Sequence, residues 1–361
     1  MAAIQFERYN STFKILNPFN GFSEEEHCVE VRKDPLLGDT SVYNPYLKDK
    51  AKAFFGQNDP ELIARLVEDT AKTCIFCGDS VRTKTARYPD DIVPGGRIEV
   101  GEAVLFANLF SIATYHPVIV LSKAHFLKLS EFDSRILSDG FRAAKLFLRD
   151  IYERDVAASF ATVNANYLLP AGASIIHPHM QMLVSDVPYS YHGRLLHASG
   201  DYLVGNGTKY FTDLVSEEKR IGERYICQQG GWHWIASFSP TGSNEITGIH
   251  ESESDLGKLT ERDLRDLCDG ISKVLALFES LGHLSFNYSF YSAKGGDTVG
   301  FHCMIKIVNR QNLYPNYRND DYFLQKLLQS ELILNLPEDL AVEARKFFVA
   351  GEAKGTDPGT P

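Results

Sequence analysis

The chain has 361 residues, of which 44% are hydrophobic and 23% are charged, with 37 lysines and arginines against 47 aspartates and glutamates. The formal net charge of -10 excludes a basic nucleic-acid platform, because contacts with phosphates need clustered positive charge. The ordinary composition also excludes a disordered or collagen-like chain. The length allows one large domain or two of roughly 150 residues each, with a core that needs no disulfides.

The six cysteines are sparse and irregularly spaced, which is not the pattern of a disulfide scaffold. The N-terminal stretch has no basic segment leading into an apolar run, and no apolar run approaches the ~18 to 20 residues of a membrane span. We therefore expect a soluble cytoplasmic protein without a membrane or nucleic-acid partner. In that compartment Cys74 and Cys77 stay reduced and are available as metal ligands.

The first half is predicted to combine short strands with one long helix. Residues 103–121 are rich in β-branched and aromatic side chains around a His-Pro break, which predicts two strands joined by a turn. Residues 129–154 place apolar side chains at helical spacing, with Ser130 and Asp133 as candidate caps. Two more short strands are expected at residues 159–164 and 180–185.

The second half repeats this order loosely. A strand is predicted at residues 232–239 and an amphipathic helix at 260–281 with Thr260 as its cap, followed by strands at 286–291 and 301–308. The repetition suggests a duplicated unit, with an alternating strand and helix fold as the alternative. Two further helices are predicted near residues 320–333 and 337–349.

The densest chemical signal is the stretch NANYLLPAGASIIHPHMQ. His177 and His179 are two residues apart, so in an extended segment they point to the same side, and Gln181 joins them there. Gly172 lets the backbone approach a ligand closely and offers amide donors to an anion. A loop with incidental histidines is the alternative, but Ser174, both histidines and the glutamine converge within one short stretch.

A second signal is the pair Cys74 and Cys77, whose CxxC spacing lets two thiolates bind one metal ion from a turn. A tetrahedral site needs two more ligands, and His125 and His177 are the candidates for a closed, structural Cys2His2 zinc site. A redox CxxC is disfavoured, because no thioredoxin-like strand precedes it. Two unrelated cysteines remain an alternative.

These motifs together resemble the galactose-1-phosphate uridylyltransferase branch of the histidine-triad superfamily, over most of the chain. The segments that carry the resemblance are VRKDPLLGDTSVYNP (residues 31–45), the CxxC, FAN (106–108), residues 125–132 and GASIIHPHMQ (172–181). The resemblance implies an α+β, histidine-triad-like fold of two related halves, with antiparallel sheets and helices packed on one face. It divides the chain into a half at 1–190 with the zinc site and the catalytic motif, and a second half at 191–349. The composition of residues 350–361 separately predicts a disordered tail.

The resemblance also implies roles for single residues. His177 is expected to bind zinc and His179 to be the catalytic nucleophile, with Gln181 beside it. The side chains expected to bind nucleotide or phosphate, together with Gln181 and the amide region of Gly172, are Arg32, Asn108, Asn166 and Ser174. Leu109 stands where the family has an acidic residue, which leaves the ribose contact of Asn108 open.

The implied activity is nucleotidyl transfer through a covalent nucleotidyl-histidine, from a nucleoside diphosphate sugar to a sugar 1-phosphate. Gln181 stands where histidine-triad hydrolases carry a third histidine, and a carboxamide takes no part in proton transfer near neutral pH. A transferase or phosphorylase is therefore favoured over a hydrolase. The alternatives are a phosphorylase that acts on a nucleotide sugar or dinucleoside polyphosphate with phosphate as acceptor, and a nucleotide-binding regulator without turnover. A homodimer is compatible with each of these.

The second half departs from the hexose-specific members of the family. Tyr291 and Met304 stand where the histidines of a second metal site would align, and only His302 remains, so we expect zinc and no second, iron-type site. The family's hexose contacts come from a Glu and a Gln near the C-terminus. Gln325, Gln329 and Glu331 are all candidates here, and the sugar therefore stays open.

Overall fold

The computed structural model describes residues 4–349, and the expected disordered tail lies outside this range. A ten-stranded sheet forms its centre, in the order β4-β5-β6-β8-β7-β12-β13-β11-β10-β9. The bounds of these strands are β4 Ile98–Val100, β5 Ala103–Ala107, β6 Pro117–Val120, β7 Phe160–Tyr167, β8 His179–Ser185, β9 Tyr225–Gln229, β10 Trp232–Ala236, β11 Ile246–His250, β12 Phe286–Ala293 and β13 Met304–Asn309.

The order of strands divides this sheet into two halves of the same topology, β4 to β8 and β9 to β13. They meet where β7 pairs with β12 over eight residues, from Phe160 opposite Ala293 to Tyr167 opposite Phe286. Every pairing within the large sheet is antiparallel, which confirms the predicted fold and excludes an alternating fold with a parallel sheet. The proposed boundary at residue 190 falls at the start of helix α5, Ser190–Asn206.

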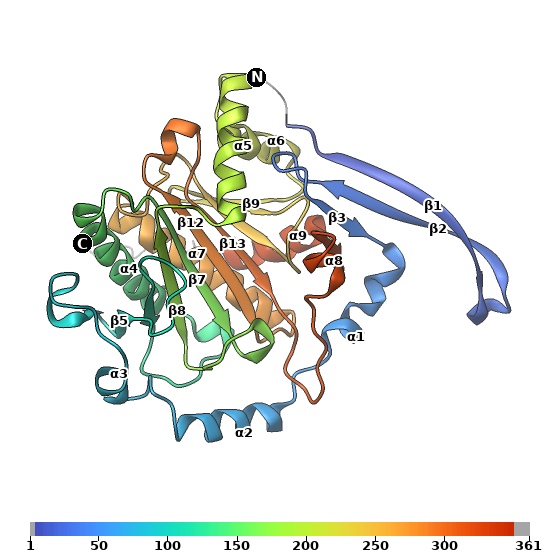
Figure 1. Ribbon diagram of the computed structural model, residues 1–361. Coiled ribbons are helices and arrows are strands. Elements are labelled where there is room, and N and C mark those ends of the chain that lie inside the picture. The colour runs from blue at the N-terminus through green and yellow to red at the C-terminus, as the bar shows by residue number, and fades with distance from the viewer. Residues whose placement is uncertain (1–3, 350–361) are drawn as a thin grey trace, which may run out of the picture.

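One long helix in each half covers the same face of the sheet. Helix α4, Ser134–Arg154, is capped by Asp133, and α7, Glu261–Ser280, by the predicted Thr260. Their apolar sides pack on each other and on the sheet, and the C-terminal helix α9, Pro337–Val349, joins them. This face, which the helices cover in Figure 1, holds the main hydrophobic core.

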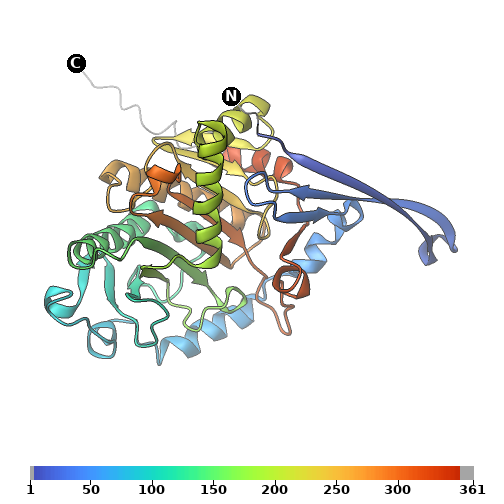
Figure 2. The same cartoon turned by 45° about the horizontal axis from the view of Figure 1, so that its top comes forward.

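The opposite face of the sheet is covered only in part. Helices α5 and α6, the latter Tyr210–Ile221, lie over the second half, and Figure 2 shows α5 crossing in front of the strands. Three shorter helices come before strand β4 in the chain, namely α1 Ala51–Phe55, α2 Pro60–Ala71 and α3 Ser80–Thr83. Within the described part of the chain, no helix combines the length and apolar character needed to cross a bilayer. On the first half, this face carries the half-buried His179 and Gln181 of β8.

A second sheet of four strands contains β1 Glu7–Asn17, β2 Ser23–Lys33, β3 Thr40–Tyr43 and β14 Ser330–Ile333. Strands β1 and β2 form a long hairpin that extends away from the body (Figures 1 and 2). The helix predicted at residues 320–333 is wrong: only α8, Phe323–Lys326, is helical there. The last four residues instead form β14, which pairs in parallel with β3, almost 300 residues earlier, and buries alternate side chains.

Candidate active site and metal site

The open face of the first half carries a group of polar side chains. Strand β8 alternates buried and half-buried residues, and this places His179 and Gln181 on the same open side, as predicted. Gln181 lies opposite Asn164 of β7, and Asn166 of β7 lies opposite Asn287 of β12. The strand register therefore brings side chains from three neighbouring strands onto one polar surface.

The imidazole of His179 is held in one orientation. Its Nδ1 donates a hydrogen bond of 2.7 Å to the carbonyl oxygen of His177, so Nε2 is the free nitrogen. The ring of Phe76, from the CxxC segment, lies edge-on at 5.4 Å between centroids. Burial lowers the pKa of His179, which keeps the ring neutral near pH 7.

Cys74, Cys77, His125 and His177 converge, and their ligand atoms all lie within 4.8 Å of one another. The Nδ1 atom of His177 lies 3.7 Å from the sulfur of Cys74 and 3.4 Å from that of Cys77, and Nδ1 of His125 lies 3.3 Å from Cys77. Tetrahedral metal-ligand distances of about 2.0 to 2.3 Å would place ligand atoms about 3.6 Å apart. The cluster therefore has the spacing of a site that could hold a metal ion.

The second ring nitrogen of each histidine in this cluster is already bound. Nε2 of His177 lies 2.7 Å from the carbonyl oxygen of Ser122, and Nε2 of His125 lies 2.9 Å from the hydroxyl of Thr70. Burial lowers the pKa of His177 to about 4, so its ring is neutral. Such partners fix the tautomer that directs Nδ1 to the centre, as is usual for metal-binding histidines. Sequence reasoning missed Thr70 and Ser122, because neither stands in a ligand motif.

A buried histidine that the sequence analysis did not select lies beside Gln181. Nε2 of His116 lies 2.7 Å from Oε1 of Gln181, and the amide of Asn108 donates to the same oxygen at 3.3 Å. His116 is 4% exposed and occupies the turn between β5 and β6. The only signal for it in the sequence is its place in the His-Pro break.

Asn166 belongs to a second polar network. Its Oδ1 accepts a hydrogen bond of 2.7 Å from Asn287, whose own Oδ1 accepts one of 2.6 Å from Arg310. Arg310 in turn forms an ion pair with Asp320. The network fixes the orientation of the Asn287 amide and leaves the amide nitrogen of Asn166 directed away from it. Asn287 was missed because only the pairing of β7 with β12 brings it here.

Two predicted phosphate contacts have other partners in the structure. The N–H of Gly172 donates to the carbonyl oxygen of Leu169 at 2.9 Å, so this amide serves the turn rather than an anion, while Ser174 nearby is exposed. Arg32 is 1% exposed and is bound to Glu30 and Glu338 at 2.6 and 2.9 Å. The structure does not bring Arg32 to the surface around His179.

Two of the three candidates for a hexose contact bind each other. The amide of Gln325 donates to the carboxylate of Glu331 at 2.9 Å, and burial raises the pKa of Glu331 to about 7. Both side chains line an open cavity of about 1000 Å³, together with Gln329 and the half-buried Tyr291. The structure thus places all three candidates at one cavity.

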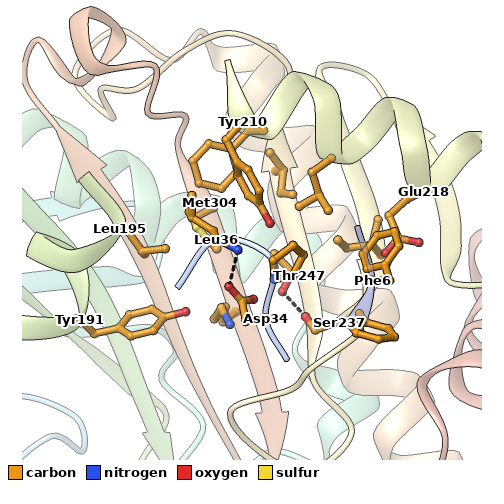
Figure 3. Close-up of a pocket in the computed structure, with 17 residues that line it drawn as sticks. Phe6, Asp34, Leu36, Tyr191, Leu195, Tyr210, Glu218, Ser237, Thr247 and Met304 are labelled. Atoms are coloured by element: carbon orange, nitrogen blue, oxygen red, sulfur yellow. Dashed lines mark hydrogen bonds between the residues drawn. The ribbon is translucent and has the colours of Figure 1, made fainter. Parts of the chain in front are cut away.

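The corresponding face of the second half contains a cavity of about 520 Å³ beneath α5 and α6 (Figure 3). Met304 lines it, beside aromatic side chains such as Tyr191 and Tyr210. Lys306 lines it too, and its ammonium is bound to the carboxylate of Glu245 at 2.8 Å. The position aligned with a histidine of the second metal site therefore carries a thioether, and the absence of that site stays a prediction.

Comparison with known proteins identifies a relative in an archaeon. No family model matches the chain. An uncharacterized protein of Archaeoglobus fulgidus is 31% identical over 330 residues, which cover 91% of this chain and 95% of that protein. The chain belongs to the family of this archaeal protein.

The fold is shared with several solved structures. An ADP-glucose phosphorylase of Arabidopsis thaliana with bound ADP-glucose superposes with a TM-score of 0.67 at 19% identity, covering 88% of this chain and 98% of that one. A mutant uridylyltransferase gives 0.64 at 16% identity, covering 89% and 98%. A protein of Arabidopsis thaliana described as similar to galactose-1-phosphate uridylyltransferase gives 0.66 at 19% identity, covering 88% and 98%. The resemblance found in the sequence is thereby confirmed for the fold.

Proposed function

We propose that this protein is a nucleotidyltransferase that works through a covalent nucleotidyl-histidine on His179. The observation that carries the proposal is the orientation of that ring, whose Nδ1 is bound to the carbonyl of His177, which leaves Nε2 as the available nitrogen of a half-buried side chain. A neutral imidazole with one free nitrogen and a fixed direction is a competent nucleophile for phosphorus. The fold shared with a uridylyltransferase and an ADP-glucose phosphorylase supports the proposal.

The reaction divides into two displacements. In the first, the lone pair of Nε2 attacks the α-phosphorus of a nucleoside diphosphate sugar, and a phosphorus–nitrogen bond forms. The bond from this phosphorus to the bridging oxygen breaks, and the sugar 1-phosphate leaves with the electron pair. In the second, a phosphate oxygen of the acceptor attacks the same phosphorus and releases His179. Ping-pong kinetics should result.

The polar surface around His179 would stabilise the reacting phosphoryl group. The amides of Gln181 and Asn166 and the hydroxyl of Ser174 are the side-chain donors that we assign to its oxygens. Gln181 cannot protonate a leaving group or activate water, so the intermediate would wait for a phosphate acceptor.

We assign Zn²⁺ to the cluster of Cys74, Cys77, His125 and His177, because thiolate and imidazole are the ligands that zinc prefers and four protein ligands make a closed site. A bound zinc ion would supply structural cross-linking rather than Lewis-acid chemistry. His177 would then hold the start of β8 in place, and its carbonyl would orient the ring of His179.

A sugar 1-phosphate is our first choice of acceptor, and inorganic phosphate is the second. The ADP-glucose phosphorylase with the same fold favours inorganic phosphate as the acceptor. It also makes nucleotide sugars the first donors to test. A nucleotide-binding regulator without turnover is the third possibility, against which the intact His179 argues.

The test is to incubate the protein with radiolabelled UDP-glucose, ADP-glucose and dinucleoside polyphosphates, and to trap an acid-labile, base-stable adduct. His179→Asn should abolish labelling, whereas His197→Asn, at an exposed position on α5, should leave it intact. Release of the label by sugar 1-phosphate indicates the transferase, and release by phosphate alone indicates the phosphorylase. Labelling of His179→Asn, or no labelling of the wild type by any donor, would exclude the covalent mechanism.

The expected homodimer is also a proposal. The β1–β2 hairpin exposes several large apolar side chains, which are Tyr9, Phe13, Ile15, Leu16, Phe19 and Phe22. Such a group on an extended hairpin is suited to packing on a second copy. Light scattering on a Phe19→Ser, Phe22→Ser variant should show a monomer where the wild type is a dimer, and a monomeric wild type would refute the proposal.

A further inference from the structure

The loop between β5 and β6 fixes the direction of two side chains. The backbone N–H of Ile112 donates to Nδ1 of His116 at 3.2 Å, so Nδ1 is an acceptor and the proton of the neutral ring lies on Nε2. The backbone N–H of Phe110 likewise donates to Oδ1 of Asn108 at 2.9 Å, which leaves the amino group of Asn108 directed elsewhere. The hydroxyl of Tyr189 binds the carbonyl of Ile112 and anchors the loop.

Both of these oriented donors point at the same atom. Nε2–H of His116 donates to Oε1 of Gln181 at 2.7 Å, and the amino group of Asn108, which also lies 3.1 Å from Nε2 of His116, donates to the same oxygen at 3.3 Å. A carboxamide can present either its oxygen or its nitrogen to a ligand, and here the oxygen is already occupied. The nitrogen of Gln181 has no hydrogen-bond partner among the described residues, and lies on the side of the sheet that carries His179.

We propose that His116 is a positioning residue that fixes the carboxamide of Gln181 with its N–H groups toward the reacting phosphoryl oxygens. This inference rests on the proposed function of His179. A glutamine turned the other way would direct a carbonyl oxygen at a phosphate and repel it. His116 therefore acts only through Gln181, and touches neither donor nor acceptor.

Burial supports this role for His116. The ring is 4% exposed, and desolvation lowers its pKa, which favours the neutral tautomer that the loop requires. A protonated ring would place a second N–H against the N–H of Ile112. The orientation of Gln181 is thus maintained by two backbone amides of a single loop.

The kinetic test is a double-mutant cycle on the rate of nucleotidylation from ADP-glucose or UDP-glucose, whichever labels His179. His116→Leu should lower kcat about tenfold or more with little change in KM, since losing one oriented donor to a developing oxyanion costs about 100-fold to 1000-fold. His116→Gln, which keeps a donor at this position, should retain most of the activity. In a Gln181→Ala background, His116→Leu should change the rate less than twofold.

Other results would overturn the inference. A His116→Leu variant with the wild-type kcat would refute the positioning role. An equal loss of rate on His116→Leu in the wild-type and Gln181→Ala backgrounds would refute it too. Nitrogen-15 NMR of the imidazole needs no turnover, and should show the proton on Nε2 of His116. A proton on Nδ1 would refute the positioning role, whereas an unlabelled wild type would refute the proposed function instead.

Discussion

The carboxylate of Glu338, at the start of α9, joins three arginines, and its removal should destabilise the fold. It accepts hydrogen bonds from Arg32 at 2.9 Å and from Arg8 and Arg224 at 3.2 Å. The side chains of Arg32 and Arg224 are only 2% and 1% exposed. Removing one partner of a buried ion pair costs about 3 to 5 kcal/mol. Because Arg32 keeps Glu30 as a second partner, we expect Glu338→Gln to cost about 3 kcal/mol.

Glu343→Gln is the matched control, because Glu343 lies on the same helix and pairs with the exposed Lys346 at 2.7 Å. An exposed pair of this kind contributes about 0.2 to 1 kcal/mol. Urea unfolding, followed by the fluorescence of the two buried tryptophans, measures both variants at pH 7.

The difference in unfolding free energy between the wild type and Glu338→Gln should also depend on pH. Burial opposes ionisation of Glu338, but the hydrogen bond and charge of Arg32 hold its pKa below the ordinary 4.5. Stability from a lowered carboxyl pKa is present above the unfolded value and is lost as pH falls through the folded one, so the advantage over Glu338→Gln should shrink below about pH 4.5. Equal stability of the Glu338 and Glu343 variants at pH 7 would refute the reasoning.

Three further predictions concern other regions. Burial raises the pKa of Glu331 in the folded protein from the ordinary 4.5 to about 7. The protonated carboxyl therefore contributes stability that is fully present below pH 4.5 and is lost as the pH rises through 7. Urea unfolding at pH 5 and 8 should therefore show a loss of up to about 3 kcal/mol that Glu331→Gln removes, and equal pH dependence of both proteins would contradict it. Gly270→Ala should cost about 1 to 3 kcal/mol of stability, because the added Cβ would lie 2.0 Å from Trp234. Gly205→Ala is the control, since a Cβ there meets open space in α5 and should not destabilise the protein. Similar melting temperatures of the two variants would refute this prediction. Metal analysis should find one zinc per chain, lost in Cys77→Ser but kept in Cys28→Ser, and retention in both would exclude the assigned ligands.

The sequence predicted those features that depend on local rules or on the chemistry of single residue types. The caps Asp133 and Thr260 begin their helices as expected, because a cap acts within one turn. The metal cluster was predictable across about 100 residues of chain, since few side chains other than Cys and His bind zinc tightly.

Features that depend on distant pairing were not predictable. Strand β14 exists because it pairs with β3, and the apolar pattern of its four residues is too short to distinguish a strand from a helix. Arg32 matched a phosphate-binding motif, but α9 supplies the carboxylate that holds it. His116 became visible only when the pairing of β6 with β8 brought Val118 opposite Gln181.

The two halves of the large sheet share one topology but differ in the side chains at corresponding positions. Strand β13 begins at Met304 after His302, just as β8 begins at His179 after His177. A thioether is only a weak hydrogen-bond acceptor and cannot be oriented as an imidazole is. Helices α5 and α6 moreover cover this face with aromatic side chains (Figure 3), whereas on the face of the first half the ring of Phe76 lies against His179. The two halves thus use the corresponding face of the sheet differently: helices cover it in the second half, and the half-buried His179 and Gln181 occupy it in the first.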